Sequence, residues 1–259
     1  MNELDPKRLV AFANTLADAS GAVIRPYFRA GIASVAKGDG SPVTKADKEA
    51  EAAIRALIER EFPDHGIFGE EHGSTRAGAR WQWVIDPIDG TKAFLVGAPL
   101  FGTLIALCDG GRPVLGLIDQ PIQRERWIGV VGRSTTFNGK QVRARPHRPL
   151  DEAILCSTTP DMFHGWKAPK HKRLDDACWF TRWGVDCYAI GMMANGYVDL
   201  MADALLKPWD YCALVPIVEA AGGVVTDWDG LPLGLASGET FLAGANPRIH
   251  AEALALLKG

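Results

Sequence analysis

Apolar residues recur at helical spacing in two stretches near the N-terminus. In the first stretch, residues 9–28, an apolar side chain returns every three or four residues, which predicts a long amphipathic helix. Gly21 and Pro26 weaken the end of this helix, because neither residue suits a helix interior. A second helix is predicted to begin at Thr44. The apolar residues of its inner face are Ala46, Ala50, Ile54, Leu57 and Ile58.

Short β-rich runs make up most of the rest of the first half. Residues 101–108 and 114–118 flank Asp109-Gly110-Gly111, which predicts a β-hairpin. Asn138-Gly139 is the tightest turn signal of the chain. We therefore expect two helices packed on an antiparallel sheet. The other predicted strands of this half are 32–36, which a loop over 37–42 follows, 83–85, 125–131 and 140–142.

The composition changes at residues 143–149, which are rich in proline, arginine and histidine. We take this segment as the boundary between two halves, 1–142 and 143–259. After it, strands alternate with helices, which favours a layered α/β unit. The expected strands are 153–157, 179–182, 197–201, 223–226 and 240–243. The expected helices are 186–194, 209–221 with a kink at Pro216, and 248–257.

Composition and charge narrow the class of protein. Apolar residues make up 47% and charged residues 23% of the 259 residues, as in ordinary soluble globular proteins. The net charge of −3 argues against a nucleic-acid binder with a broad basic surface. No apolar run is long enough to span a bilayer, and the N-terminus lacks a signal-peptide pattern. The five cysteines form no C-x-x-C or Cys/His cluster, so we expect free thiols in the cytoplasm rather than a zinc site.

Two acids stand where a buried strand is predicted to end. The apolar residues Trp83-Val84-Ile85 are followed by Asp86-Pro87-Ile88-Asp89-Gly90-Thr91. Pro87 has a fixed φ, so we expect the chain to turn there and direct both carboxylates and the Ile88 carbonyl into one small volume. Such oxygen ligands suit a hard cation such as Mg²⁺, and the amides after Gly90 can receive an anion. The simpler alternative is that Asp-Pro and Asp-Gly are common turn dipeptides.

Further acids occur at places that suit the same site. Thr44-Lys45-Ala46-Asp47 has the pattern of a capping box, so its acid could simply cap the second helix. Glu70-Glu71 stand in a glycine-rich loop, where adjacent acids are usually solvated. Asp210 falls in the first turn of a predicted helix, where an acid complements the helix macrodipole. Each acid has a structural explanation alone, but their number favours a shared site.

These motifs resemble those of the inositol monophosphatase-like superfamily of Mg²⁺-dependent, lithium-sensitive phosphatases. The first family signature is found at residues 83–91 and the second at 209–223, while 42–47 and 69–71 match two supporting motifs. The four motifs stand in the family's order, and the resemblance extends over nearly the whole chain. The resemblance implies an α+β fold, a layered α-β-α-β-α sandwich of the inositol monophosphatase/fructose-bisphosphatase type, and a homodimer.

The resemblance also implies two to three Mg²⁺ ions in each active site. One ion would be held by Glu70, Asp86 and the carbonyl of Ile88. A second would be held by Asp86, Asp89 and Asp210, and a weaker third would lie near Glu70. Ions that share Asp86 suit the in-line hydrolysis of a phosphate monoester, because its dianionic group and both in-line oxygens need charge neutralisation.

The resemblance assigns the catalytic residues in the same way. Thr91, hydrogen-bonded to Asp47, would orient the attacking water and help to deprotonate it, and Glu70 would complete the catalytic set. The amides of Gly90 and Thr91 would hold the phosphate group. Whether Glu71 contributes to a metal shell stays open.

The substrate prediction rests on residues that differ from the usual inositol phosphatase pattern. Inositol phosphatases usually continue Asp-Gly-Thr with Thr-Asn-Phe, whereas this chain has Lys92-Ala93-Phe94. That variant resembles the branch that holds the bacterial histidinol-phosphate phosphatases and the nucleotide-bisphosphate phosphatases. The segments around Asp186 and Asp203 resemble the histidinol-phosphate phosphatases most closely. Histidinol phosphate carries an ammonium and an imidazole, so both acids could pair with it, and Arg182 could orient Asp186 or reach the substrate. The alternative is that Asp186 is only a helix N-cap.

Other interpretations stay open. An inositol phosphate, a 3′-phosphoadenosine nucleotide or fructose bisphosphate could be the substrate within the same class of phosphatase. A binding module without activity is disfavoured, because it need not keep a water-activating pair such as Thr91 and Asp47. A purely structural Ca²⁺ site would not need two metals that share Asp86.

Overall fold

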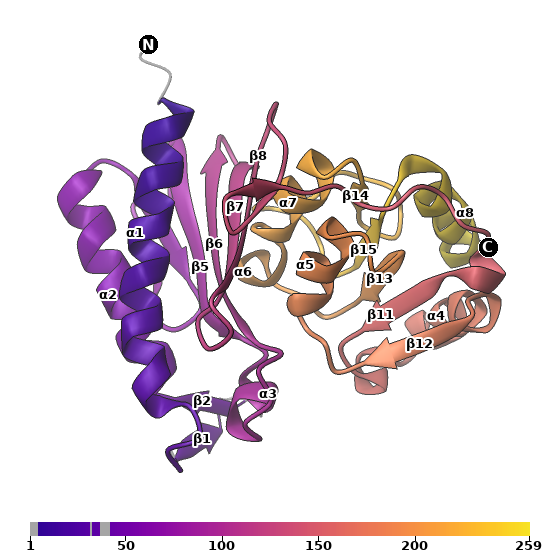
Figure 1. Cartoon of the computed structure of the whole chain (residues 1–259), viewed down its shortest axis with the longest axis horizontal. Helices are drawn as coiled ribbons and strands as arrows, with labels where there is room; N and C mark the ends of the chain where they lie inside the picture. The colour runs from indigo at the N-terminus through magenta and orange to yellow at the C-terminus, as the bar shows by residue number, and fades with distance from the viewer. Residues whose placement is uncertain (1–4, 32, 37–41) are drawn as a thin grey trace.

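Helices and sheets alternate along the long axis of the molecule in five layers (Figure 1). The computed structural model describes residues 5–31, 33–36 and 42–259. The first layer holds two packed helices, α1 (Pro6–Ile24) and α2 (Lys45–Glu61). The end of α1 is followed by a short 3₁₀ turn, so the predicted helix is four residues too long at its C-terminal end.

The second layer is a sheet of eight strands. They are β3 (Gly66–Gly69), β4 (Gly73–Thr75), β5 (Trp81–Asp89), β6 (Gly102–Asp109), β7 (Arg112–Gln120), β8 (Glu125–Val130), β9 (Thr136–Phe137) and β10 (Lys140–Gln141). Their order is β10-β9-β8-β7-β6-β5-β3-β4. Neighbouring strands are antiparallel, except that β3 runs parallel to β5. The β6–β7 and β9–β10 hairpins were predicted. The glycine-rich segment around Glu70 and Glu71 was expected to be a loop throughout, but residues 66–69 form β3, residue 73 begins β4, and residues 70–72 form the turn between them.

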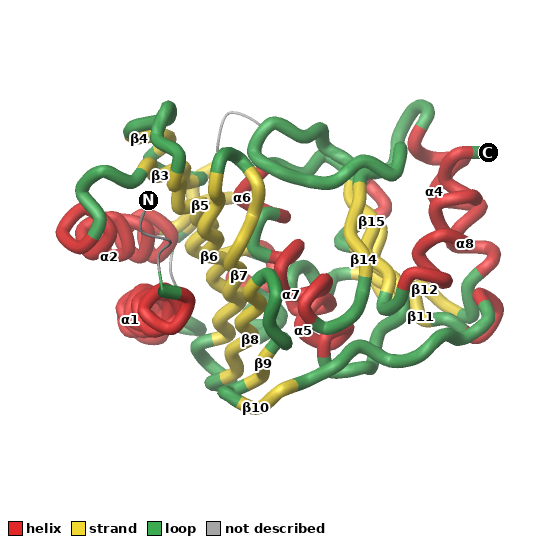
Figure 2. The backbone as a smooth tube through the Cα atoms, turned by 90° about the horizontal axis from the view of Figure 1, so that it is seen from above, coloured by secondary structure: helices red, strands yellow, loops and turns green. Residues whose placement is uncertain are grey.

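The third layer consists of three short helices between the two sheets (Figures 1 and 2). They are α5 (Tyr188–Ala194), α6 (Pro208–Tyr211) and α7 (Leu214–Ala220). This layer approaches the first sheet closely, because a Cβ added at Gly116 of β7 would overlap the carbonyl oxygen of Ala213. A glycine at this position therefore allows the helix layer to pack directly on the sheet.

Helices α6 and α7 were expected to form one helix over residues 209–221. The break falls at residues 212–213. Pro216 explains it, because proline has no N–H to donate to the carbonyl four residues earlier, and its ring clashes with that carbonyl at Cys212. The predicted kink is therefore a full interruption of the helix.

The fourth layer is a five-stranded sheet in the order β12-β11-β13-β15-β14. Its strands are β11 (Ile154–Ser157), β12 (Phe180–Trp183), β13 (Leu200–Asp203), β14 (Val224–Thr226) and β15 (Phe241–Gly244). Strand β11 is parallel to both β12 and β13, so the carboxyl ends of these three strands lie at one edge. The strand expected at 197–201 begins three residues later, because Tyr197 is exposed and follows a turn at Gly196.

The fifth layer is formed by α4 (Lys167–Ala177) and α8 (Pro247–Lys258), which cover the far face of the second sheet (Figure 2). The sequence did not predict α4, because Leu174 is its one buried aliphatic side chain and Pro169 lies in its first turns. The order helix, sheet, helix, sheet, helix confirms the predicted α-β-α-β-α sandwich.

The remaining strands and helix lie near the turn after β5. A two-stranded sheet pairs β1 (Ser34–Ala36) with β2 (Pro42–Thr44), and α3 (Thr91–Leu95) follows β5. Residue 32 of the predicted strand and most of the predicted loop, residues 37–41, lie outside the described residues. Over the ranges that are described, no helix combines the length and the apolar character needed to cross a membrane.

The expected boundary at residues 142/143 stays a proposal. The segment after β10 runs from the first sheet toward the second, which agrees with this division (Figure 2). However, one buried cluster contains Trp127 of β8, Leu214 of α7 and Phe241 of β15. Both halves therefore share a hydrophobic core.

Candidate active site

The end of strand β5 carries the first two acids, Asp86 and Asp89. We expected the strand to stop at Asp86, but it continues to Asp89 with a shift in its pairing to β6. Pro87 cannot donate to β6, and the N–H of Ile88 donates instead to Asp86 Oδ1 at 2.9 Å. The chain turns later, at Gly90, whose φ of 86° favours glycine.

Two buried hydroxyl groups hold this irregular strand end from inside the protein. Thr103 Oγ1 of β6 donates to the carbonyl oxygen of Pro87 at 2.8 Å and lies 2.9 Å from Ser20 Oγ of α1. Both side chains are fully buried. Because a buried carbonyl needs a partner, these groups fix the backbone between the two acids.

A third acid reaches the same place from the C-terminal half. Asp86, Asp89 and Asp210 each offer one carboxylate oxygen, and these atoms lie within 4.8 Å of one another. Asp210 lies in α6, and its Oδ2 accepts the N–H of Lys207 at 2.7 Å. The simpler alternative was that Asp210 only serves the start of its helix. This role is compatible with a place in the acidic cluster.

Glu70 is brought beside Asp86 by the parallel pairing of β3 with β5. In this register Gly69 lies opposite Ile85, and the N–H of Glu70 donates to the carbonyl of Ile85 at 3.1 Å. Glu70 and Asp86 are the next residues along the chain after this pair, so their side chains lie next to each other, and the charge of Glu70 acts on Asp86. This contact depends on a strand that the sequence analysis did not predict.

The electrostatics of the cluster favour a bound cation. Burial, followed by the negative charge of Glu70 and the other two acids, raises the pKa of Asp86 well above its ordinary range. Burial and the charge of Asp89 do the same for Asp210. Burial also raises the pKa of Asp89, although the N–H of Cys187, which donates to its Oδ2 at 2.8 Å, opposes the shift. Clustered carboxylate oxygens are the donor set that hard divalent cations such as Mg²⁺ prefer.

The predicted catalytic residues Thr91 and Asp47 lie in the first turns of α3 and α2. Thr91 Oγ1 donates to the carbonyl oxygen of Ile88 at 3.0 Å. Asp47 is fully buried, and its Oδ2 accepts the N–H of Thr44 at 2.8 Å and also the Thr44 hydroxyl. The capping box is thus present, as the alternative interpretation predicted. The hydrogen bond between Thr91 and Asp47 stays a prediction.

Asp186 lies against the turn that carries the acids. A Cβ added at Gly90 would lie 3.2 Å from Asp186 Cγ. The next residue, Cys187, is the one whose N–H binds Asp89, so a loop of the C-terminal half closes onto the end of β5. Cys187 is also the N-cap of α5, and Asp186 lies outside the helix with a φ of 45°. The alternative that Asp186 is a helix N-cap is therefore wrong.

Asp203 lies behind Asp186 at the end of β13. It is fully buried, and both the N–H and the hydroxyl of Thr158 donate to its carboxylate at 2.8 Å. Burial raises the pKa of Asp203 to about 7 against these hydrogen bonds. Burial and the charges of Asp89 and Asp203 raise the pKa of Asp186 to about 8, while Lys92 lowers it. Asp186 and Asp203 thus form a second acidic pair next to the cluster.

Arg182 has a different position from the other predicted substrate residues. It lies on β12, at the edge of the second sheet, and its side chain is exposed. Its guanidinium donates to the carbonyl of Trp183 at 2.8 Å. No described hydrogen bond or ion pair joins Arg182 to Asp186.

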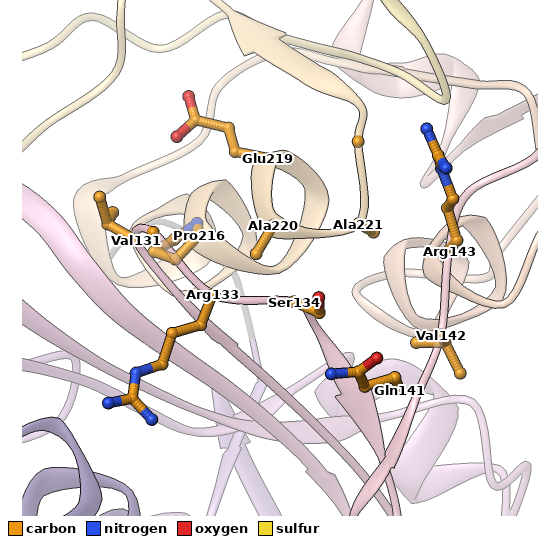
Figure 3. A pocket seen from close by; sticks show the side chains of 12 residues that line it. Val131, Arg133, Ser134, Gln141, Val142, Arg143, Pro216, Glu219, Ala220 and Ala221 are labelled. Carbon is orange, nitrogen blue, oxygen red and sulfur yellow. The ribbon is translucent and has the colours of Figure 1, made fainter.

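A separate cavity of about 630 Å³ lies between the end of β8, the segment after β10 and α7 (Figure 3). Its charged side chains belong to Arg133, Arg143 and Glu219. The charged groups point away from one another, so they do not converge on a common ligand (Figure 3). None of the acids of the cluster lines this cavity.

Polar residues that were not predicted from the sequence support the site from the core. Ser20 lies one turn from both Leu16 and Ile24 on the buried face of α1, and Glu51 lies one turn after Asp47 on α2. A polar residue that interrupts an apolar stripe was the available signal. The supporting residues are Ser20, Glu51, Thr103 and Thr158.

Comparisons with known proteins agree with this geometry. The sequence model of the inositol monophosphatase family matches residues 5–258. The chloroplastic bifunctional phosphatase IMPL2 of Arabidopsis thaliana is 45% identical over 99% of this chain and 76% of its own length. A histidinol-phosphatase of Streptomyces coelicolor is 37% identical over 98% and 97% of the two chains. The structure of an inositol monophosphatase from Zymomonas mobilis superposes with a TM-score of 0.91 at 43% identity, over 99% of this chain and 100% of that one.

Proposed function

The chain belongs to the inositol monophosphatase family, and on that premise we propose that this phosphatase uses Mg²⁺ to hydrolyse histidinol phosphate. The observation that carries the choice of substrate is the position of Asp186 against Gly90. In this proposal, the leaving group of an ester bound at the Gly90 turn would lie beside the Asp186 carboxylate. A cationic leaving group suits this position better than a neutral polyol does.

The side chains fit the divalent cations that the proposal requires. Glu70, Asp86 and the carbonyl of Ile88 would hold one Mg²⁺, and Asp86 would share a second with Asp89 and Asp210. The Ile88 carbonyl accepts a hydrogen bond from Thr91 and still has a second lone pair for a cation. When bound, such ions neutralise phosphate charge and lower the pKa of a coordinated water.

The protein groups around the turn would position the ester and the attacking water. The amides of Gly90 and Thr91 would donate to phosphate oxygens. Thr91 Oγ1 would accept a hydrogen bond from the attacking water, and Asp47 would take up the proton. This relay requires the hydroxyl hydrogen of Thr91 to turn from Ile88 to Asp47.

Asp186 would bind the cationic end of the substrate. Its raised pKa means that the carboxyl group without a ligand is easily protonated near neutral pH. A cation within ~4–6 Å favours the charged form, so a bound ammonium or imidazolium would lower the pKa of Asp186. The acid would then release its proton to solvent and pair with the cation as a carboxylate. Asp203, which is buried and bonded to Thr158, would act from behind Asp186 rather than touch the substrate. Arg182 would reach the ester only after its guanidinium leaves the carbonyl of Trp183.

The relatives support two candidate substrates. The histidinol-phosphatase of Streptomyces coelicolor favours histidinol phosphate. The inositol monophosphatase of Zymomonas mobilis, at 43% identity, favours an inositol phosphate as the alternative. A 3′(2′),5′-bisphosphate nucleotide is a third candidate of the same reaction class, and a non-catalytic binding module is disfavoured by the acidic cluster.

A substrate panel tests the proposal. Phosphate release would be measured from histidinol phosphate, inositol 1-phosphate, 3′-phosphoadenosine 5′-phosphate and glycerol 2-phosphate, with Mg²⁺ and with EDTA. We expect activity only with Mg²⁺ and the highest kcat/KM for histidinol phosphate. A better inositol or nucleotide substrate would refute the choice of ester, and no hydrolysis of any ester with Mg²⁺ would refute the phosphatase.

The homodimer and the cytoplasmic location stay predictions. We infer the dimer from the resemblance alone, and analytical ultracentrifugation tests it. A sedimentation coefficient of a monomer at micromolar concentration would contradict it.

A further inference from the structure

A buried carboxylate on α2 reaches the loop that carries Glu70. The side chain of Glu51 is fully buried. Its Oε2 accepts the N–H of Glu71 at 2.7 Å, and its Oε1 accepts the N–H of His72 at 3.2 Å. These are the two backbone amides that directly follow Glu70 in the chain.

Arg55, one turn later on α2, holds Glu51 in place. Its Nε donates to Glu51 Oε1 at 2.6 Å, and the two side chains are 10% and 0% exposed. The same guanidinium donates to Thr75 Oγ1 at 3.1 Å and to the carbonyl of Gly73. The ion pair therefore binds both the start and the end of the turn between β3 and β4.

Gly69, the residue before Glu70, leaves room for the side chain of Glu51. A Cβ added at Gly69 would overlap Glu51 Oε1, so only glycine allows the carboxylate to approach the loop this closely. Strand β5 holds the amide of Glu70 itself, through the carbonyl of Ile85 at 3.1 Å. The backbone is thus fixed at Glu70 and at the next two residues.

We propose that Glu51 is a positioning residue for metal binding, which fixes residues 70–72 so that the Glu70 carboxylate faces Asp86. This inference rests on the proposed Mg²⁺ site. A buried ion pair is weak evidence of a role in stability alone, because desolvation of the charges offsets their attraction. Groups that orient metal ligands from behind are a common use of buried charged hydrogen bonds.

The test measures metal binding directly. In Glu51→Gln the side chain keeps its shape, but its NH₂ group must face one of the donors that now bind the carboxylate. We expect the affinity for Mg²⁺, measured by titration calorimetry without substrate, to fall by ~10–100-fold. At saturating Mg²⁺, the KM for the ester should stay within about threefold of the wild-type value. Glu59→Gln, an exposed acid on the same helix, is the matched control and should bind Mg²⁺ like the wild type.

The second variant, Gly69→Ala, keeps the charge of Glu51 but forces its carboxylate away from the loop. It should lose Mg²⁺ affinity to a similar extent, and it decides the outcome if Glu51→Gln does not fold. A lower unfolding temperature with unchanged Mg²⁺ affinity in either folded variant would overturn the inference, because a merely structural role gives that result. A wild-type protein that binds no Mg²⁺ would refute the proposed function itself, which separates the two failures.

Discussion

Asp186 lies directly against Gly90. A loop of the C-terminal half therefore touches the turn that follows Asp89 and carries the proposed phosphate-binding amides. A Cβ on Gly90 would lie 3.2 Å from Asp186 Cγ and 3.3 Å from its Cβ. The cluster formed by Asp86, Asp89 and Asp210 likewise draws on both halves. The candidate site therefore exists only where the two sheets and the helices between them are correctly packed.

The contact at Gly90 gives a prediction with a matched control. Gly90 and Gly111 have φ values of 86° and 87°, but Gly111 has no described atom within 4 Å of an added Cβ. Alanine at either position should cost ~1–2 kcal/mol of stability through the left-handed backbone conformation. Only Gly90→Ala should also lose phosphatase activity, because its methyl group would press on Asp186 and on the backbone of Phe101. Equal specific activity of the two folded variants would show that the contact is unimportant for function.

Asp86→Asn should abolish turnover while the fold persists. Asp86 is the acid that both proposed cations share, so the substitution removes charge from two metal positions at once. Loss of a single electrostatic stabiliser costs ~10²–10³ in rate, and a shared metal ligand should cost more. Steady-state kinetics and thermal unfolding check this. Activity within about tenfold of the wild type in a normally folded variant would exclude Asp86 as a metal ligand.

Thr91→Ala should lower kcat far more than it raises KM. The Thr91 hydroxyl is proposed to act on the attacking water, so it contributes in the transition state rather than in substrate binding. Kinetics at saturating Mg²⁺ separate the two parameters. If the substitution changes KM alone, Thr91 binds the substrate and does not act on the water.

The unfolding temperature of the protein without Mg²⁺ should fall as the pH rises from about 6.5 to 8.5. The pKa is raised to about 8 for Asp186 and to about 7 for Asp203, so the folded chain binds more protons than the unfolded chain in this range. Stability from such acids is present at low pH and is lost as the pH passes the folded pKa. The buried His171 and His250, with pKa values of about 4, oppose the trend near pH 6.5, because an ordinary histidine of the unfolded chain is about half protonated there. The two acids outweigh them at that pH, and from about pH 7.5 upward both histidines are neutral in both states.

Mg²⁺ should reverse this pH dependence, because a cation favours charged carboxylates. The increase in unfolding temperature caused by Mg²⁺ should therefore be larger at the upper end of the range. Asp186→Asn should show a weaker pH dependence than the wild type in EDTA. An unfolding temperature that rises with pH over this range would contradict the assigned pKa directions.

Local signals in the sequence predicted the fold class and the acids. Asp86 and Asp89 stand three residues apart on one motif, and the capping box at Thr44 is readable from four residues. The position of the turn was wrong by several residues, because the bulge at Pro87 is stabilised by the Asp86–Ile88 hydrogen bond. Such a bond is not evident from the dipeptide Asp-Pro.

Contacts between distant segments could not be predicted. Glu70 meets Asp86 only because β3 pairs in parallel with β5, and the glycine-rich sequence of β3 resembles a loop. Helix α4 lacks an apolar stripe, since its surface toward the second sheet is formed largely by Lys167, His171 and Leu174. In each case the tertiary environment supplies what the local pattern lacks.

The most direct test of the account compares two esters in two proteins. The ratio of kcat/KM for histidinol phosphate to that for glycerol 2-phosphate would be measured at saturating Mg²⁺ for the wild type and for Asp186→Asn. We expect the substitution to lower this ratio by about 10–150-fold and to spare the neutral ester. This factor corresponds to ~1.5–3 kcal/mol, the contribution of a charged hydrogen bond. A ratio that does not change, or a wild-type protein that prefers inositol 1-phosphate, would contradict the assignment of Asp186 and of the substrate.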